Sequence, residues 1–171
     1  MKNIYYNYDN LKEQDINRWV RRAKIFIINS DDEILLAHSN NNYFFVGGRV
    51  EENETFDECI VREVKEETGI DLHLEKREPF FNITYMNKDY PDVSINTKSV
   101  ANYYLIKCDI KPDLNKVNLT DDEKNSNFRL VYIHKDKVLE ELTNSLEFCS
   151  RENVVKDTME VIKEYLKNTN K

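Results

Sequence analysis

One segment of the chain gathers acidic residues at a spacing that suits metal binding. It covers residues 48–70 and reads GRVEENETFDECIVREVKEETGI. Within it, Glu63, Glu66 and Glu67 stand at positions i, i+3 and i+4, which lie on one side of an α-helix. Like charges at this spacing cost about 0.2–0.5 kcal/mol per pair, and a divalent cation that prefers oxygen ligands reverses that cost. The spacing therefore predicts a carboxylate cluster that binds a metal ion beside phosphate oxygens.

The elements that must position these acids are expected to be a loop, a helix and a turn. Gly48 opens the segment and lets the backbone approach a ligand closely. Asn53 or Thr55 is suited to cap a helix that runs to Thr68, and Gly69 suits the left-handed position that ends helices. At about 100° per residue the acids adjoin an apolar stripe, which consists of Phe56, Ile60, Val61 and Val64. The carboxylates should therefore lie at the boundary between helix and core, partly removed from water.

The whole segment is similar to the signature of the Nudix hydrolases. Its pattern is Gly-x5-Glu-x7-Arg-Glu-apolar-x-Glu-Glu-x-Gly-apolar, and every fixed position and both apolar positions match. At ordinary residue usage, the chance of such a match in a chain of this length is on the order of 10⁻⁷. The resemblance implies a Mg²⁺-dependent pyrophosphohydrolase, with Mn²⁺ as the alternative ion. Its substrate would be a nucleoside di- or triphosphate derivative, in which metal-activated water cleaves the diphosphate linkage.

The resemblance also implies a role for each residue of the motif. The metal would be held by one backbone carbonyl and three carboxylates, those of Gly48, Glu63, Glu66 and Glu67. Arg62 would act in catalysis by orienting the neighbouring carboxylates, and Glu63 would add the role of a base. Glu54 would contact the metal ligands without binding the metal itself. No residue is assigned to substrate binding, although four aromatic residues are able to stack a base: Tyr43, Phe44, Tyr85 and Tyr103.

A further catalytic carboxylate is expected outside the segment, because many members of the family supply one from a later loop. Between Glu78 and Glu123 the chain has no Glu, and Asp121, Asp122 and Glu123 lie in a polar stretch before an apolar run. Glu123 is our first choice as general base, a role that contributes about 10²–10⁴-fold in rate. A solvated acidic loop without a catalytic role explains these residues equally well, in which case Glu63 would be the base.

The rest of the chain mixes strand and helix patterns without a regular alternation, which predicts an α+β fold. The resemblance is more specific and implies a Nudix-type α/β/α sandwich around a mixed β-sheet, with a loop–helix–loop metal site. Strands are expected at residues 23–28, 33–38, 43–46, 72–76, 79–86, 99–107 and 128–134, and later helices near 135–146 and 151–167. We expect a single domain at residues 21–171. Residues 1–20 should form an N-terminal arm with a short helix before Trp19, acting as a packed edge, a substrate wall or a dimer contact.

Composition restricts the partners. The net charge is −7, and residues 48–70 alone contribute eight acids and three bases, a balance of −5. An acidic protein binds nucleic acid polymers poorly, so a small nucleotide derivative is the expected partner, and a homodimer is compatible with the arm. The basic residues Arg18, Arg21, Arg22 and Lys24 are expected to be solvated, with phosphate contact as the alternative.

The expected location is the cytoplasm, without a membrane association. No apolar run approaches the roughly 18 residues of a membrane span, and the first residues do not resemble a signal peptide. Cys59, Cys108 and Cys149 are scattered without metal or disulfide spacing, which fits a reducing compartment. The alternative function is a Nudix-like sensor that binds a nucleotide without hydrolysing it. Such modules usually have a damaged motif, whereas this motif is intact.

Overall fold

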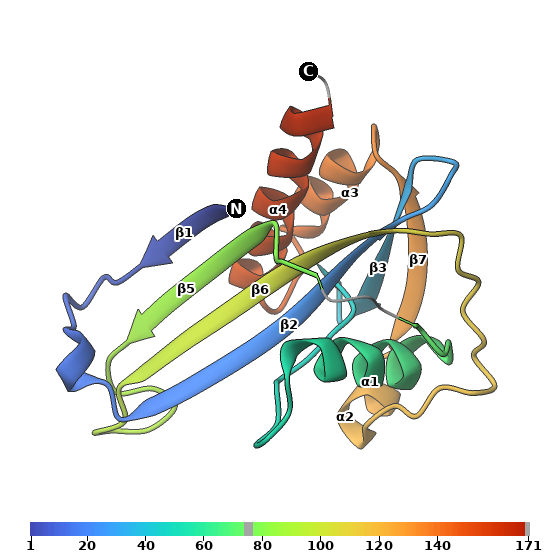
Figure 1. Ribbon diagram of the computed structural model, residues 1–171. Coiled ribbons are helices and arrows are strands. Elements are labelled where there is room, and N and C mark those ends of the chain that lie inside the picture. The colour runs from blue at the N-terminus through green and yellow to red at the C-terminus, as the bar shows by residue number, and fades with distance from the viewer. Residues whose placement is uncertain (74–76, 170–171) are drawn as a thin grey trace.

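Two long strands, β2 (Arg18–Ile28) and β6 (Thr97–Lys107), pair in parallel along their whole length and form the centre of the sheet. The computed structural model describes residues 1–73 and 77–169, and in this part of the chain the sheet has seven strands (Figure 1). The other strands are β1 (Lys2–Tyr6), β3 (Glu33–Ser39), β4 (Asn42–Phe44), β5 (Phe81–Asn87) and β7 (Arg129–His134). The helices are α1 (Phe56–Thr68), α2 (Asp121–Asn125), α3 (Val138–Ser145) and α4 (Glu152–Thr169), with a 3₁₀ turn at Glu13–Asp15.

The sheet is mixed. Its order is β1-β5-β6-β2-β3-β4, and β7 pairs with β3 beside that path. The pairs β1–β5 and β2–β6 are parallel. The pairs β5–β6, β2–β3, β3–β4 and β3–β7 are antiparallel. This combination of orientations confirms the α+β fold class.

Helices cover the two faces of the sheet (Figure 1). On one face, Cys59, Ile60 and Val64 of α1 pack against alternate residues of β2, which include Ile25 and Ile27. On the opposite face, the core contains other residues of β2 together with side chains of α3 and α4, among them Phe26, Leu142 and Ile162. The expected α/β/α sandwich is therefore confirmed, and α1 holds its acidic residues at one edge of this core.

The first residues of the chain are part of the sheet. β1 is an edge strand parallel to β5, and the expected short helix is a single 3₁₀ turn at Glu13–Asp15. Trp19 lies inside β2, which begins five residues before the strand expected at 23–28. Of the strand expected at 72–76, Leu72 and His73 have no strand conformation, and residues 74–76 lie outside the described residues. In residues 1–73 and 77–169, no helix is long and apolar enough to cross a membrane.

Candidate metal centre

The ends of α1 are fixed by its own sequence. Thr55 caps the helix: its Oγ1 accepts from the Glu58 N–H at 3.2 Å, and the Glu58 carboxylate accepts from the Thr55 N–H at 2.8 Å. Gly69 ends the helix with φ +73°, and its N–H donates to the Lys65 carbonyl at 2.9 Å. These caps confine α1 to the range expected from the sequence and set the rotational position of its acids.

The glycine loop lies directly between β2 and α1. The Ala23 N–H donates to the Gly48 carbonyl at 3.1 Å, so the loop continues the sheet beside β2. A Cβ atom on Gly48 would collide with the Glu63 carboxylate, which means that the loop backbone and this carboxylate are in direct contact. A carbonyl oxygen has two lone pairs, so Gly48 keeps one that is not used by Ala23. The expected carbonyl and carboxylate are thus side by side.

Arg62 forms hydrogen bonds with three carboxylates. Its Nε and Nη2 donate to the two oxygens of Glu54 at 2.8 and 3.0 Å. Its Nη1 donates to Glu63 Oε1 at 2.7 Å and to Glu66 Oε2 at 3.2 Å. The bidentate contact with Glu54 fixes the plane of the guanidinium, and the remaining nitrogen fixes the two acids of α1. Arg62 thus lies between Glu54 on one side and Glu63 and Glu66 on the other, and the orienting role of Arg62 stays a prediction.

The three acids of α1 differ in exposure. Glu63 and Glu67 are 9% and 4% exposed, whereas the Glu66 side chain is 34% exposed. Burial raises the pKa of Glu63, and the hydrogen bond and charge of Arg62 oppose this effect. Burial also raises the pKa of Glu67, against the charge of Lys24 and a 3.0 Å hydrogen bond from the Gly47 N–H. Two buried carboxylates with raised pKa values mark a place where further positive charge would be stabilising.

Lys24 is a residue of this site that the sequence analysis placed on the solvated surface. Its side chain is half-buried, and its ammonium donates to the carbonyls of Phe45, at 3.3 Å, and Gly47. It also lies 5.7 Å from the centre of the Phe44 ring. Burial lowers the pKa of Lys24, and the charge of Glu67 opposes this effect. Lys24 stands inside the apolar run 23–28, and this position in the sequence could have indicated a partly buried lysine. The interpretation of Lys24 as a solvated surface residue was wrong.

Glu123 lies in α2 and not in a loop, which corrects the expectation for this stretch. Its carboxylate accepts from the Thr120 N–H at 2.6 Å and from Thr120 Oγ1 at 2.8 Å, so it caps its own short helix. Its charge is close enough to raise the pKa of Glu67, after the larger effects of burial, Lys24, Gly47 and Glu63. The fold therefore brings Glu123 towards the acids of α1, with one carboxylate oxygen, Oε2, engaged by Thr120.

The chemical types of the expected ligands are suited to a divalent cation. The donor set consists of carboxylates and one glycine carbonyl, which are the hard oxygen ligands that Mg²⁺ prefers. Within the described ranges, no three acidic, histidine or cysteine side chains converge closely enough to enclose a cation by themselves. Arg62 holds one oxygen each of Glu63 and Glu66, and the Gly47 N–H holds one oxygen of Glu67. Binding of a cation would therefore draw the carboxylates closer together than they lie here.

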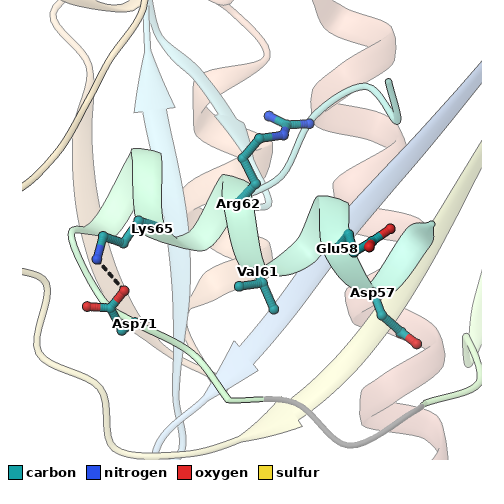
Figure 2. A pocket seen from close by; sticks show the side chains of 6 residues that line it. All are labelled: Asp57, Glu58, Val61, Arg62, Lys65 and Asp71. Atoms are coloured by element: carbon teal, nitrogen blue, oxygen red, sulfur yellow. Dashed lines mark hydrogen bonds and ion pairs between the residues drawn. The ribbon is translucent and has the colours of Figure 1, made fainter. Parts of the chain in front are cut away.

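A shallow cavity of about 460 Å³ lies on the outer side of α1 (Figure 2). Its lining residues are Asp57, Glu58, Val61, Arg62, Lys65 and Asp71. Figure 2 shows Arg62 pointing away from Val61 and Asp71, while Lys65 forms an ion pair with Asp71. The acids Glu63, Glu66 and Glu67 do not line this cavity, which touches the candidate metal centre only at Arg62.

Comparisons with known proteins identify the family. A family model described as the NUDIX domain matches residues 18–147, which is most of the chain. The chain therefore belongs to the Nudix family of hydrolases. Its fold is similar to that of the MutT protein from Methanosarcina mazei Go1, with a TM-score of 0.54 and 16% identity over 88% of this chain and 96% of that chain. At this identity the likeness supports the fold alone.

Two curated relatives match short segments. The chain is 44% identical over 52 residues to a protein from Vibrio atlanticus named NAD-capped RNA hydrolase NudC, a match covering 28% of this chain and 19% of that protein. It is 49% identical over 49 residues to a protein from Methanocaldococcus jannaschii named ADP-ribose pyrophosphatase, covering 26% of this chain and 29% of that protein. The chain thus spans about a fifth to a third of the length of these relatives.

Proposed function

We propose that the protein is a Mg²⁺-dependent pyrophosphohydrolase that cleaves the diphosphate linkage of a nucleoside di- or triphosphate derivative with water. The observation that carries this proposal is the contact between the Gly48 backbone and Glu63, next to two further acids of α1 that Arg62 and Gly47 fix in direction. A structural helix would gain nothing from burying Glu63 and Glu67 together, because burial raises both pKa values and disfavours the charged forms.

Each residue has a defined part in this proposal. Glu63, Glu66 and Glu67 would hold the ion together with the Gly48 carbonyl. The bound ion would supply a polarised phosphoryl group and a water of lowered pKa. Arg62 would keep Glu63 and Glu66 aimed at the ion, and Glu54 would keep the guanidinium in its plane.

The base is assigned to Glu123, with Glu63 as the alternative. Both hydrogen bonds from Thr120 reach Oε2 of Glu123, so Oε1 is the oxygen that would accept from the attacking water. Glu63 is held by Arg62, which favours its charged form and suits a metal ligand. A Glu123→Gln variant would separate the two assignments, because loss of the base predicts a fall in kcat of at least about tenfold.

The test is release of a nucleoside monophosphate from a panel of diphosphate compounds in the presence of Mg²⁺ or Mn²⁺. The panel contains ADP-ribose, NADH, nucleotide sugars, coenzyme A, dinucleoside polyphosphates and nucleoside triphosphates. The names of the two relatives make NADH and ADP-ribose the first compounds to assay. We expect cleavage by the wild type and a loss of at least about tenfold in Glu66→Gln, since a ligand oxygen is removed from the ion.

Glu52→Gln is the matched control, because Glu52 is an exposed acid of the same segment outside the motif. It should keep full activity. Equal turnover by the wild type and Glu66→Gln would contradict the assigned metal site. Tight binding of one panel compound without any product would instead support the sensor function.

A further inference from the structure

Two arginines face each other beside the glycine loop. Arg22 of β2 and Arg49, which follows Gly48, form an isolated antiparallel bridge. Directly opposed residues in antiparallel pairs project on the same face, and like charges in such a pair are destabilising. Both residues are exposed. The fold thus places two positive charges together at the end of the loop that carries the candidate metal ligands.

This pair lies on the sheet face opposite α1. Ala23 and Ile25 of β2 pack in the core under α1, whereas Phe26 packs in the core with α4. Because side chains alternate along a strand, Arg22 and Lys24 project on the α4 side. The Gly48 carbonyl therefore has the acids of α1 on one side and a cationic surface on the other.

Arg151 adds a third positive charge to the pair. It directly precedes α4, and its backbone N–H donates to Asn42 Oδ1 at 2.7 Å, which ties the start of α4 to β4. The Arg22 side chain keeps contact with water, but neighbouring groups partly desolvate its guanidinium, which lowers its pKa, and the charges of Arg49 and Arg151 lower it further. The charges of Arg49 and Arg151 therefore both reach Arg22. We refer to Arg22, Arg49 and Arg151 as the arginine cluster.

The arginine cluster has no carboxylate partner in the described part of the chain. The ion pairs found in residues 1–73 and 77–169 involve Arg62, His134 and several lysines, and no member of the cluster takes part. This is unexpected in a chain with a net charge of −7. A guanidinium fork matches the geometry of phosphate oxygens, so an anionic ligand would relieve the repulsion within the cluster.

We propose that the arginine cluster binds a phosphoryl group that lies outside the scissile diphosphate. The inference rests on the proposed hydrolase function, because the scissile group is placed at the Gly48 carbonyl and the acids of α1. Arg49 is the next residue after Gly48, so the bound group belongs to the same phosphate chain. The substrate class is then a nucleotide with three or more linked phosphates, favoured over diphosphate compounds such as ADP-ribose or nucleotide sugars.

The first test compares diadenosine tetraphosphate with diadenosine diphosphate, which differ only in the number of phosphates. We expect the wild type to prefer the tetraphosphate by at least about tenfold in kcat/KM, the range of a charge-assisted contact. The double variant Arg22→Gln/Arg49→Gln should lose this preference through a higher KM for the tetraphosphate. Its kcat/KM for the diphosphate should change less than about twofold.

Arg21→Gln is the matched control. Arg21 is adjacent to Arg22 but belongs to the other face of β2, where its guanidinium lies 5.7 Å from the centre of the Phe56 ring. Removing this charge should leave the preference unchanged. If Arg21→Gln lowered the preference as much as the double variant, the effect would be one of net charge and the cluster would not be a site.

A second test does not depend on turnover. Calorimetry with inorganic tripolyphosphate in EDTA should show binding to the wild type and to Glu66→Gln, and binding at least about tenfold weaker to Arg22→Gln/Arg49→Gln. Equal binding to all three proteins, or no binding to the wild type, would overturn the arginine cluster as a phosphate site. Tripolyphosphate binding without hydrolysis of any nucleotide would overturn the proposed hydrolase while leaving the site in place.

Discussion

At the scale of single residues, the candidate centre depends on Gly48 and Arg62. Gly48 leaves the space in which the Glu63 carboxylate lies, and Arg62 fixes that carboxylate at 2.7 Å from its Nη1. The two residues therefore determine the direction of a buried acid whose charged form is disfavoured by its surroundings. Both belong to fixed positions of the motif, which explains why they could be predicted from the sequence.

Replacement of Gly48 by alanine tests this contact. The added Cβ would displace the Glu63 carboxylate, and Gly48 does not have the positive φ that would strain the backbone of an alanine. We expect the affinity for Mg²⁺ and the turnover to fall at least about tenfold, the usual loss when the support of a metal ligand is changed. A Mg²⁺ titration of activity measures both, and circular dichroism checks that the fold is retained. Unchanged Mg²⁺ affinity would show that Glu63 is not held by the loop.

Other residues of the site could not be predicted, because their role arises from contacts distant in sequence. Lys24 is a basic residue in a strand, and only the packing of residues 45–47 against β2 makes it half-buried beside Glu67. Glu123 was expected near the site from its position in the chain, and its role there stays a prediction, whereas its own helix α2 and the bond to Thr120 were not expected. Side-chain orientation of this kind depends on tertiary structure, which local sequence does not determine.

At the scale of elements, α1 was predictable to within a residue because its limits are encoded locally. A reciprocal cap at Thr55 and Glu58 begins the helix, and a glycine in the left-handed region ends it. The long strands were less predictable. β2 and β6 extend into residues 18–22 and 97–98, most of which are polar, and their mutual pairing stabilises the strand conformation there.

Replacement of Gly69 by alanine tests the end of α1. At φ +73° an alanine is strained, and its Cβ would also collide with the Asp113 carbonyl. We expect a loss of about 1–3 kcal/mol in the free energy of unfolding, measured by urea denaturation. The exposed Asn115→Ala in the neighbouring stretch is the control and should cost less than about 0.5 kcal/mol. A neutral Gly69→Ala would mean that the helix does not end in this conformation.

At the scale of the whole molecule, the sandwich could be inferred from the family resemblance, but the strand order could not. The parallel pairing of β1 with β5 joins residues about 80 positions apart, and no local pattern specifies such a pair. The same assembly half-buries Asp157 of α4 against β5, where the Tyr85 hydroxyl donates to its carboxylate at 2.7 Å. Burial raises the pKa of Asp157 to about 6, with a further contribution from Glu160.

The raised pKa makes stability depend on pH in a defined direction. The folded protein binds the Asp157 proton more tightly than the unfolded chain, so stability falls as pH rises from about 4 to about 6 and stays lowered above that range. An asparagine amide at this position would still accept from Tyr85 without ionising. Asp157→Asn should therefore gain roughly 1–2 kcal/mol in urea denaturation at pH 7.5 and much less at pH 4.5. The exposed Asp31→Asn is the control, and an equal gain at both pH values would contradict this explanation.

The measurement that tests the central claim most directly is hydrolysis in ¹⁸O-labelled water with Mg²⁺, comparing the wild type with Glu66→Gln and Glu52→Gln. We predict that the wild type and Glu52→Gln release products with ¹⁸O in one phosphate, and that Glu66→Gln does so at least about tenfold more slowly. The position of the label would also identify the phosphorus that water attacks. Equal rates in all three proteins, or no labelled product from any diphosphate compound in the panel, would contradict a metal-dependent hydrolase centred on α1.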